Sequence, residues 1–375
     1  YNPSTNLVDR GSFWNLKYDS KQYGNRVEFL VTEDIAGRQN RFMAGWDSLH
    51  LDFTNNGNAN SNAANSSVSL TGFDPGYGYD PLLRNFESQI TQNSFFMEDA
   101  LNVTNSLKVL VGLRKDYIDT EKTGDTRPAQ TNSAKEFTPL TWRAGLVFDI
   151  TPASSLYGQI SRGTDPVSTL IGLNLTNAAY DLTTVRQHEI GAKHLLANNK
   201  GEMTLAIFHI AKDNIVTQVA NNASLSTQGG SQSSRGIEYS TTLLPAEHWR
   251  IDVNATLLNA RFDELVQDGV SRAGNTPLNV PEKVANAWLY YQASAWEAGI
   301  GARYVGKRYS NNANTGTVDS YTVYDASATW NINKQVSLRA NLRNLTDKFY
   351  ATTAYNTQQI IGAPRMFELT AEFRY

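Results

Sequence analysis

Hydrophobic and polar side chains alternate along much of this chain, and the pattern is clearest in its last residues. From Phe367 to Tyr375 every second residue is apolar or aromatic, and the residues between them are charged or polar. Side chains in a β-strand point alternately to opposite faces. The pattern therefore predicts a strand with one oily face and one charged face.

The same alternation recurs along the chain in segments long enough to cross a bilayer as tilted strands, which takes about 9–11 residues. It is present in residues 250–257, 324–330 and 336–343, in residues 107–116 with Leu110 as an exception, and less cleanly in residues 140–149, where Val147 interrupts the polar face. Residues 202–213 and 284–292 fit less well, because both of their faces carry apolar residues. In a membrane barrel the apolar face meets lipid and the polar face lines the interior. The recurrence predicts an all-β fold, an antiparallel transmembrane β-barrel.

This interpretation assigns individual side chains to the two faces. The side chains that we expect to point outward are Leu107, Val109, Val111, Leu113, Ile251, Val253, Phe367, Leu369 and Phe373. Those expected to point inward are Arg114, Asp252, Arg339, Arg343 and Glu372. Inward arginines either attract anions or pair with carboxylates of neighbouring strands or of a plug.

The predicted connections are of two kinds, which gives the chain an orientation. The short ones are residues 34–37, 102–105, 150–153, 197–200, 245–247 and 331–335. The long ones are residues 54–89, 121–137, 163–183, 219–232, 263–282, 310–319 and 348–364. Outer-membrane barrels place short turns in the periplasm and long loops outside the cell.

Counting back from the C-terminus gives about 15 strands, whereas single-chain bacterial barrels have an even number. No signal-peptide pattern follows Tyr1, so we expect the front of the molecule to be missing.

Composition fits a membrane barrel and removes several classes of protein. Mean hydropathy is −0.43, which a transmembrane barrel tolerates because its membrane signal lies in alternation. The 18 Tyr, 15 Phe and 7 Trp suit aromatic girdles at the two membrane interfaces. The absence of cysteine excludes disulfide scaffolds, thiol catalysis and Cys-ligated metal sites. A net charge of −3 gives no indication of nucleic-acid binding. No Gly-x-Ser-x-Gly elbow is present, and the five histidines give no indication of a metal or haem site. We therefore expect no enzyme activity, no cofactor and no metal.

Several short motifs resemble those of TonB-dependent outer-membrane receptors, particularly the ferric-siderophore receptors. The segment from Asn341 to Tyr350 resembles the family's penultimate-strand signature, and Gly362-Ala363-Pro364-Arg365 its closing motif. Further matches follow the family's order from about residue 90 onward. They lie at residues 95–99, 111–116, 155–162, 189–193, 235–238 and 279–281. Within the C-terminal motif the matching positions are Asn344, Leu345, Asp347, Tyr350, Gly362, Pro364, Arg365 and Tyr375.

The resemblance implies a 22-stranded barrel with a folded plug in its lumen. Residues 1–375 would then be the C-terminal part of the barrel domain, without the N-terminal plug, the energy-coupling box and the first strands. The implied function is uptake of a ferric siderophore across the outer membrane of a Gram-negative cell, with energy from the TonB complex. The implied surroundings are outer-membrane lipid and lipopolysaccharide, with no nucleic-acid partner. The aromatic Tyr375 would serve barrel assembly rather than transport.

Different functions stay open at this point. A related receptor for cobalamin, haem or carbohydrate would share the barrel, although no haem-receptor Phe-Arg-Ala-Pro type motif occurs. A passive porin and a lectin-like β-sandwich fit the ordered motifs and the alternation of short and long loops less well.

The largest predicted loop holds the candidate ligand contacts Tyr77, Tyr79 and Arg84. Aromatic faces and a guanidinium on an external loop suit an anionic, aromatic ferric chelate, through stacking and charge. The alternative is a surface loop whose tyrosines pack on neighbouring loops or lie at the lipopolysaccharide belt.

Overall fold

The computed structural model is built almost entirely from β-strands joined into one large antiparallel sheet. It describes residues 4–10, 15–58, 66–69, 82–124, 132–165, 171, 180–196, 200–219, 222–356 and 358–374. Within these residues the sheet has 16 strands, and each strand on its main path pairs with the next one along the chain. The path is β2 (Leu16–Ile35), β3 (Arg38–Asn58), β5 (Leu82–Asn102), β6 (Leu107–Gly124), β8 (Leu140–Thr151), β9 (Ser154–Thr164), β10 (Thr184–Leu195), β11 (Gly201–Val219), β12 (Asn222–Leu243), β13 (Trp249–Glu264), β16 (Lys283–Gln292), β17 (Trp296–Val305), β20 (Tyr321–Asn331), β21 (Val336–Arg343) and β24 (Met366–Phe373).

The remaining strands lie beside this path or in its long connections. The short strand β7 (Ser133–Phe137) pairs with β6. Small two-stranded sheets are formed by β1 (Leu7–Arg10) with β4 (Ser66–Ser69), β14 (Val266–Gln267) with β15 (Val270–Ser271), β18 (Arg308–Tyr309) with β19 (Thr317–Val318), and β22 (Ala351–Tyr355) with β23 (Gln358–Ile361).

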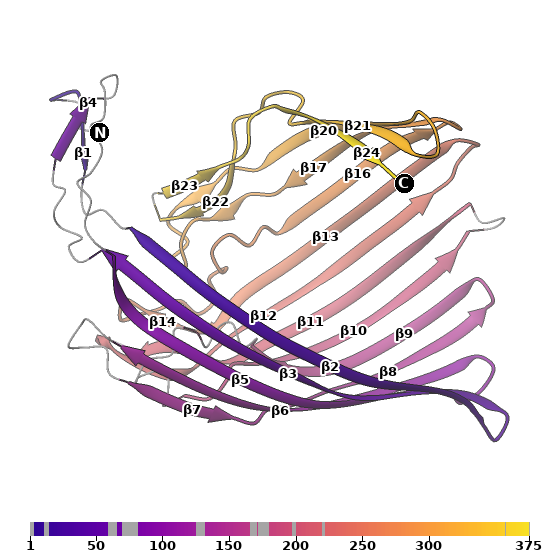
Figure 1. Ribbon diagram of the computed structural model, residues 1–375, viewed down its shortest axis with the longest axis horizontal. Coiled ribbons are helices and arrows are strands. Elements are labelled where there is room, and N and C mark those ends of the chain that lie inside the picture. The colour runs from indigo at the N-terminus through magenta and orange to yellow at the C-terminus, as the bar shows by residue number, and fades with distance from the viewer. Residues whose placement is uncertain are drawn as a thin grey trace.

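Short turns gather at one end of the sheet and longer connections at the opposite end, as Figure 1 shows. The turn between β2 and β3 consists of Ala36 and Gly37, with φ values of 53° and 76°. Two consecutive residues with positive φ form the hairpin turn whose twist matches that of the flanking strands. The turn residues thus fix the β2–β3 register without a bulge.

Several strands run further toward the long-loop end than the alternation predicts. The predicted loop 219–232 was wrong, because β11 continues to Val219 and β12 begins at Asn222. The predicted loop 54–89 is also shorter, since β3 reaches Asn58 and β5 begins at Leu82. Polar residues in these extensions still pair in the ladder, and their polarity reflects a position beyond the apolar band rather than a loop conformation.

The register places the predicted apolar side chains on one continuous face. One ladder row joins Gly158, Ile190, Ile207, Ile237 and Leu257 on five neighbouring strands. The exposed large apolar side chains on this face include Val111, Leu113, Leu146, Ile160, Ile300, Phe367, Leu369 and Phe373. A continuous exposed apolar face that extends over many neighbouring strands is the kind of surface that a bilayer covers.

The opposite, polar face is the concave one. Arg114 of β6 reaches Asp47 of β3 across β5, and Arg143 of β8 reaches Glu98 of β5 across β6. Side chains of second-neighbour strands meet in this way where a curved sheet brings them together. The predicted inward positions Asp252, Arg339 and Glu372 belong to this same face by register.

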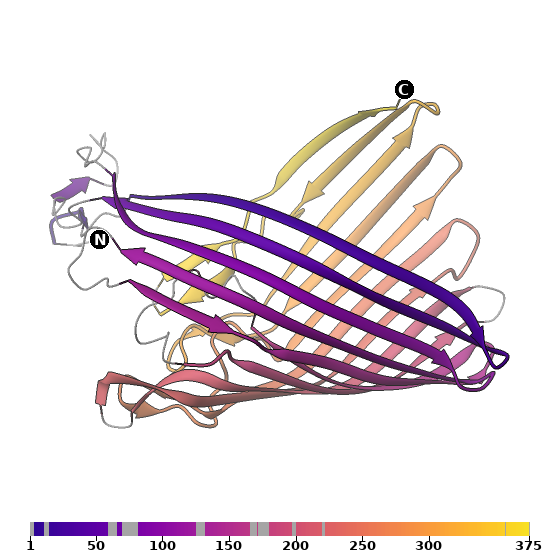
Figure 2. The same ribbon diagram turned by 60° about the horizontal axis from the view of Figure 1, so that its bottom comes forward.

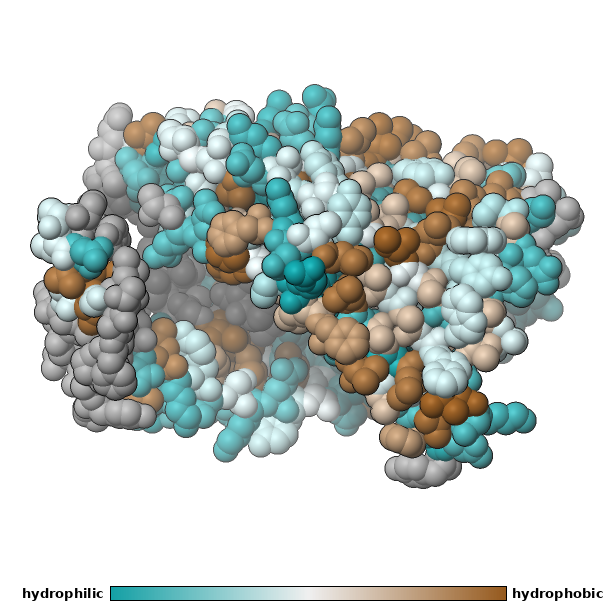
Figure 3. All heavy atoms as spheres, turned by 90° about the horizontal axis from the view of Figure 1, so that it is seen from above, coloured by the Kyte–Doolittle hydropathy of each residue, from teal (hydrophilic) through white to brown (hydrophobic). Residues whose placement is uncertain are grey.

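The sheet curls without closing on itself within the described residues (Figures 1 and 2). β2 pairs only with β3 and β24 only with β21, so both edges of the sheet lack a neighbour within the described part of the chain. The number of strands in the intact barrel stays a prediction. On the side seen in Figure 3, hydrophobic side chains gather over the middle and the short-turn end, and a hollow opens toward the long-loop end. No helix in the described residues is long and apolar enough to cross a membrane.

Candidate functional site on the polar face

Ion pairs cross the polar face from strand to strand. Arg114 donates a forked pair of hydrogen bonds to Asp47, with Nη1–Oδ2 and Nη2–Oδ1 distances of 2.7 and 3.0 Å. Its Nε also donates to Asp116 Oδ1 at 2.8 Å. Two carboxylates therefore neutralise one guanidinium that is only one-third exposed. A planar fork of this kind fixes side-chain direction as well as charge.

The polar face also carries aromatic rings that lie over glycines of the neighbouring strand. The ring of Tyr157 covers Gly191 and that of Tyr290 covers Gly299, so closely that a Cβ atom at either glycine would lie 2.5 Å from a ring atom. In every such pair the two residues are ladder partners. The pairs are Phe96 with Gly45, Tyr157 with Gly191, Phe208 with Gly236, Trp288 with Gly301, and Tyr290 with Gly299. Glycine is required at these positions because only a residue without a side chain leaves room for the ring.

Three of these rings are covered in turn by a cation. The guanidinium carbon of Arg26 lies 4.6 Å from the centre of the Phe96 ring. The corresponding distances are 4.2 Å from Arg250 to Tyr290 and 5.7 Å from the Lys193 ammonium to Tyr157. At these three positions the aromatic ring therefore lies between the strand backbone and a cation, and the cation is the group that faces the interior.

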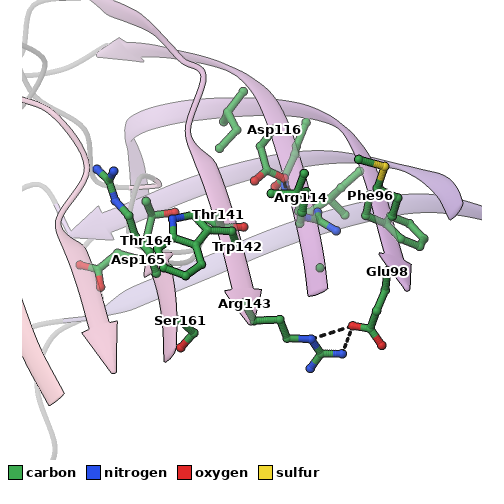
Figure 4. Close-up of a pocket in the computed structure, with 18 of the residues that line it drawn as sticks. Phe96, Glu98, Arg114, Asp116, Thr141, Trp142, Arg143, Ser161, Thr164 and Asp165 are labelled. Carbon is green, nitrogen blue, oxygen red and sulfur yellow. Dashed lines mark hydrogen bonds and ion pairs between the residues drawn. The ribbon is translucent and has the colours of Figure 1, made fainter. Parts of the chain in front are cut away.

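A pocket of about 760 Å³ opens along β3, β5, β6, β8 and β9. Its polar lining includes Gln92, Arg114, Asp116, Arg143 and Asp165. Figure 4 shows Arg143 extending toward Glu98, with Arg114 and Asp116 beside each other. Both signs of charge line the pocket, and its cations are largely engaged by carboxylates. It therefore suits a polar protein surface or a polar solute better than a bare anion.

Toward the long-loop end, the pocket is bordered by a small apolar core. Leu51, Ile90 and Ile118 of adjacent strands are buried together with Phe137 and Leu182, and Ile171 packs against them. Leu182 and Ile171 belong to the connection between β9 and β10. These two residues therefore cover the polar face of β3, β5 and β6 near the loop end.

Lys122 lies on the loop-end extension of β6 and is buried. Its ammonium lies 4.2 Å from the centre of the Phe86 ring. Burial lowers the pKa of Lys122, because removal from water disfavours the charged form.

The C-terminal motif residues come together at the base of the last long connection. The buried Asn344 side chain donates to the carbonyl oxygens of Lys348 and Ala363 and accepts from the Lys348 amide, at 2.8–3.0 Å. Asp347 accepts from the Arg365 amide at 2.8 Å. The two ends of this connection, residues 344–365, are thus tied together by side chains from its beginning.

Tyr350 and Gly362 complete this motif. The ring centroids of Tyr350 and Tyr321 are 4.4 Å apart, and the Gly362 amide donates to the Tyr350 carbonyl. A Cβ atom at Gly362 would overlap the Tyr350 ring. Leu345 donates its amide to the Tyr324 carbonyl, and Pro364 precedes the Arg365 amide that Asp347 holds. These motif residues therefore build the loop base. Tyr375 lies outside the described residues.

Asparagines connect this loop to its two neighbours. Asn279, between β15 and β16, exchanges a pair of hydrogen bonds with the backbone of Ala354 at 2.7 and 2.9 Å. Asn314, between β18 and β19, makes a similar pair with Thr276 at 2.8 and 2.9 Å. Both asparagines have positive φ, which asparagine tolerates better than most residues. The three connections consequently form one interlocked layer.

The candidate ligand contacts predicted from sequence are only partly described. Tyr77 and Tyr79 lie outside the described residues. Arg84 was expected in a loop and lies instead near the start of β5, opposite Asn56 of β3. Its Nη1 atom is 2.5 Å from Glu87 Oε1, so a carboxylate already neutralises this guanidinium.

Most of the arginines that were predicted to point inward form ion pairs with carboxylates of the strands. Arg114 pairs with Asp47 and Asp116, and Arg343 pairs with Glu368 at 3.3 Å. Arg339 lies opposite Thr370 in the ladder. The ring–glycine pairs were missed in the sequence. Their signal was present, however, because Phe208, Trp288 and Tyr290 lie in the two segments with apolar residues on both faces.

Comparison with known proteins identifies the family. The family model described as "TonB dependent receptor-like, beta-barrel" matches residues 1–345. The probable TonB-dependent siderophore receptor PiuA of Acinetobacter baumannii is 30% identical over 312 residues, which cover 77% of this chain and 41% of that protein. The ferrichrome outer membrane transporter/phage receptor of Escherichia coli K12 is 28% identical over 282 residues, covering 72% of this chain and 36% of that protein.

Solved structures agree on the fold. The crystal structure of the siderophore receptor PiuA from Acinetobacter baumannii superposes with a TM-score of 0.85 at 25% identity, over 96% of this chain and 56% of that one. The ferripyoverdine receptor of Pseudomonas aeruginosa superposes with a TM-score of 0.78 at 18% identity, over 100% of this chain and 50% of that one. The chain thus spans about half of these structures and less than half of the curated relatives. It belongs to the TonB-dependent receptor family and forms part of an outer-membrane β-barrel of that family.

Proposed function

We propose that this chain is the C-terminal portion of a receptor barrel that binds a ferric siderophore outside the cell and imports it with TonB-derived energy. The observation that carries the proposal is the family match over residues 1–345, together with a relative whose name is that of a probable TonB-dependent siderophore receptor. The continuous apolar face and the charged concave face supply the physical basis, because they suit a bilayer outside and a polar interior.

An N-terminal plug and the first barrel strands complete the receptor in this proposal. The chain covers 41% of the PiuA relative, and both edges of its sheet lack a neighbour among the described residues. A strand edge exposes unpaired N–H and C=O groups, which a bilayer does not hydrogen-bond. Additional strands between β24 and β2 would pair both edges and close the barrel.

The plug explains why transport needs energy. A plugged lumen admits no passive flow, so the ligand passes only when work is done to move the plug. The pocket and the ion pairs of the concave face would contact the plug. Because their arginines are paired with carboxylates, they would form a surface of little net charge, which suits a plug that must be displaced and must then rebind. Energy then comes from the TonB complex, which acts on the N-terminal part.

Ligand capture belongs to the long connections at the outer end. Tyr77, Tyr79 and Arg84 are the proposed contacts, because two stacking faces and a guanidinium suit an anionic aromatic chelate. Because Glu87 neutralises Arg84, the Arg84 guanidinium would contribute to chelate binding mainly through oriented hydrogen bonds and less through its net charge. The ferric chelate is cargo, and the proposal includes no resident cofactor and no catalytic step.

A neighbouring ligand class is the alternative. The metal-pseudopaline receptor CntO of Pseudomonas aeruginosa is 25% identical over 312 residues. Its name supports a chelate of another metal as the cargo. In either case the transport mechanism is the same.

Uptake of radiolabelled ferric chelates by cells that produce the intact protein tests the proposal. Uptake should require a functional TonB complex. Alanine at Tyr77, Tyr79 and Arg84 together should weaken chelate binding while folded barrel accumulates normally, and Arg38→Ala at a short turn serves as the control. Unchanged affinity for every chelate tested would remove these residues from the site. Uptake that persists without TonB would reject the receptor hypothesis and favour a porin.

A further inference from the structure

Three polar side chains lie side by side on β5, β6 and β7 near the long-loop end of the sheet. Lys122 of β6 is the ladder partner of Ser88 on β5 and of Ser133 on β7. The β5–β6 ladder has no register shift between Arg114 and Lys122, so Lys122 lies on the same concave face as Arg114. Partners across an antiparallel ladder have Cβ atoms about 4.5–5.5 Å apart. The three side chains therefore form one group, which we call the Lys122 cluster.

All members of the Lys122 cluster are buried, although they are polar. Their exposed fractions are 2% for Ser88, 7% for Ser133 and 8% for Lys122. The Oγ atoms of both serines are buried without a hydrogen-bond partner. The Lys122 ammonium lies over the Phe86 ring and makes no hydrogen bond or ion pair with any residue that the structure describes. Buried polar groups in folded proteins nearly always have a partner, so three such groups in one place indicate a bound species.

The surroundings of the cluster indicate the charge of that species. The concave-face positions around it on β5, β6 and β7 hold aromatic, aliphatic, hydroxyl and lysine side chains: Phe86, Ser88, Ile90, Ile118, Thr120, Lys122, Ser133, Lys135 and Phe137. The nearest carboxylate on this face of β6 is Asp116, about 20 Å away at strand rise, and Arg114 and Gln92 already bond to it. Glu87 and Glu121 point to the opposite face, because side chains alternate along a strand. Among the described residues of these three strands, no carboxylate balances the charge of the cluster.

Positive charge is therefore in excess at this end of the concave face. The second lysine, Lys135 of β7, donates to the Tyr180 carbonyl oxygen at 3.2 Å, which is a neutral acceptor. Burial lowers the pKa of Lys122, because removal from water disfavours its charged form. A bound anion would offset that penalty, whereas a bound water molecule would leave the charge unbalanced.

We propose that the Lys122 cluster binds a small inorganic anion of the size of chloride. The ammonium supplies the charge, and the hydroxyl groups of Ser88 and Ser133 supply hydrogen-bond donors. The backbones of the two serines are two strand spacings apart, about 9.6 Å, and both Oγ atoms are closed off from solvent. A monoatomic ion suits such an enclosed site, and a ligand of the size of a siderophore does not. The inference goes beyond the proposed transport, because this ion is part of the barrel and not cargo.

The ion would fasten β7 to the sheet. β7 extends along the loop end of β6 (Figure 1) and pairs with no other strand in the described part of the chain. Its ladder with β6 runs from Ser133 to Phe137 only. An ion shared by β5, β6 and β7 adds a connection at Ser133, the first residue of this short strand.

Thermal unfolding of the intact receptor in a neutral detergent tests the site. Sodium chloride is compared with sodium gluconate at equal ionic strength, because gluconate is too large for an enclosed site. A ligand that binds only the folded state raises the unfolding temperature as its concentration rises. The unaltered receptor should unfold about 1–2 °C higher in saturating chloride than in gluconate. K122M, which removes the cation, should show no difference between the two salts.

Further variants separate the cluster from its neighbours. S88A and S133A should each weaken the apparent affinity for chloride about fivefold. K135M removes the other lysine of this face, and T120V removes a buried hydroxyl that already donates to the Lys135 carbonyl at 2.8 Å. Both of these controls should keep the chloride response, because neither Lys135 nor Thr120 belongs to the cluster.

Bromide gives a direct view of the site, because its anomalous scattering locates it in crystals of the intact receptor. A bromide peak within hydrogen-bond distance of Lys122 Nζ is expected in the unaltered receptor and not in K122M. Equal unfolding temperatures in chloride and gluconate, or no bromide peak, would reject the anion site and leave water as the occupant. An equal chloride response in K122M would assign the effect to salt in general. Should K122M not assemble, an unchanged chloride response in both S88A and S133A would reject the site.

Discussion

Tyr290 of β16 covers Gly299 of β17 on the concave face, and a Cβ atom at Gly299 would lie 2.5 Å from Tyr290 Cδ1. Arg250 lies over the same ring at 4.2 Å and bonds to Asp252 at 3.1 Å. The ring is therefore held between a glycine below and a cation above. The glycine is a packing requirement of this face rather than a flexible point in the strand.

Replacing Gly299 by alanine should destabilise the barrel. The added methyl group displaces the Tyr290 ring and with it Arg250, and overpacking of this kind costs about 1–3 kcal/mol. The free energy of unfolding, obtained from a guanidinium titration of the intact receptor in detergent, should fall by that amount.

Gly145→Ala is the matched control for this substitution. Gly145 lies on the same concave face, but a Cβ atom there meets its nearest neighbour at 3.4 Å, an ordinary contact. Alanine at this position should leave stability almost unchanged. Equal effects at Gly145 and Gly299 would show that loss of glycine, and not the covering ring, causes the destabilisation.

The fork between Arg114 and Asp47 should show measurable coupling. Both side chains are partly shielded from water and their geometry is bidentate. A double-mutant cycle with R114A and D47A should give a coupling of about 1 kcal/mol in the free energy of unfolding. The pair Arg374–Glu372 is exposed, and the same cycle there should give no measurable coupling. Zero coupling at Arg114–Asp47 would mean that the fork does not hold β3 and β6 together.

The alternation of side chains was sufficient to predict the sheet and its two faces. Residues 107–113 and 367–373 follow the pattern because lipid on one side demands it. The extent of the strands beyond the apolar band was not predictable in the same way. Residues 222–232 were expected to form a loop and belong to β12, because ladder pairing continues where the bilayer no longer imposes hydrophobicity.

The candidate site was harder to predict from the sequence than the sheet was. The family motif marked Asn344, Asp347 and Gly362, but their role at a loop base depends on contacts between distant segments. The interlocking of Asn279 with Ala354 joins positions 75 residues apart. No local pattern indicates such a pair. The ring–glycine pairs are similar, because each partner looks ordinary until the register brings the two together.

The base of the last loop gives a final prediction. Asn344 is 3% exposed and makes three hydrogen bonds to backbone within the loop. Alanine at this position leaves two carbonyls and one amide without their partner and strains a backbone with a φ of 50°. Stability should fall by about 1–3 kcal/mol, and residues 344–365 should become sensitive to protease added to intact cells. Asn356 has the same φ of 50° and an exposed side chain, so Asn356→Ala is the control for backbone strain alone. Protease sensitivity in both variants would assign the effect to the left-handed backbone. Sensitivity only in Asn344→Ala would assign it to the buried hydrogen bonds that close the loop.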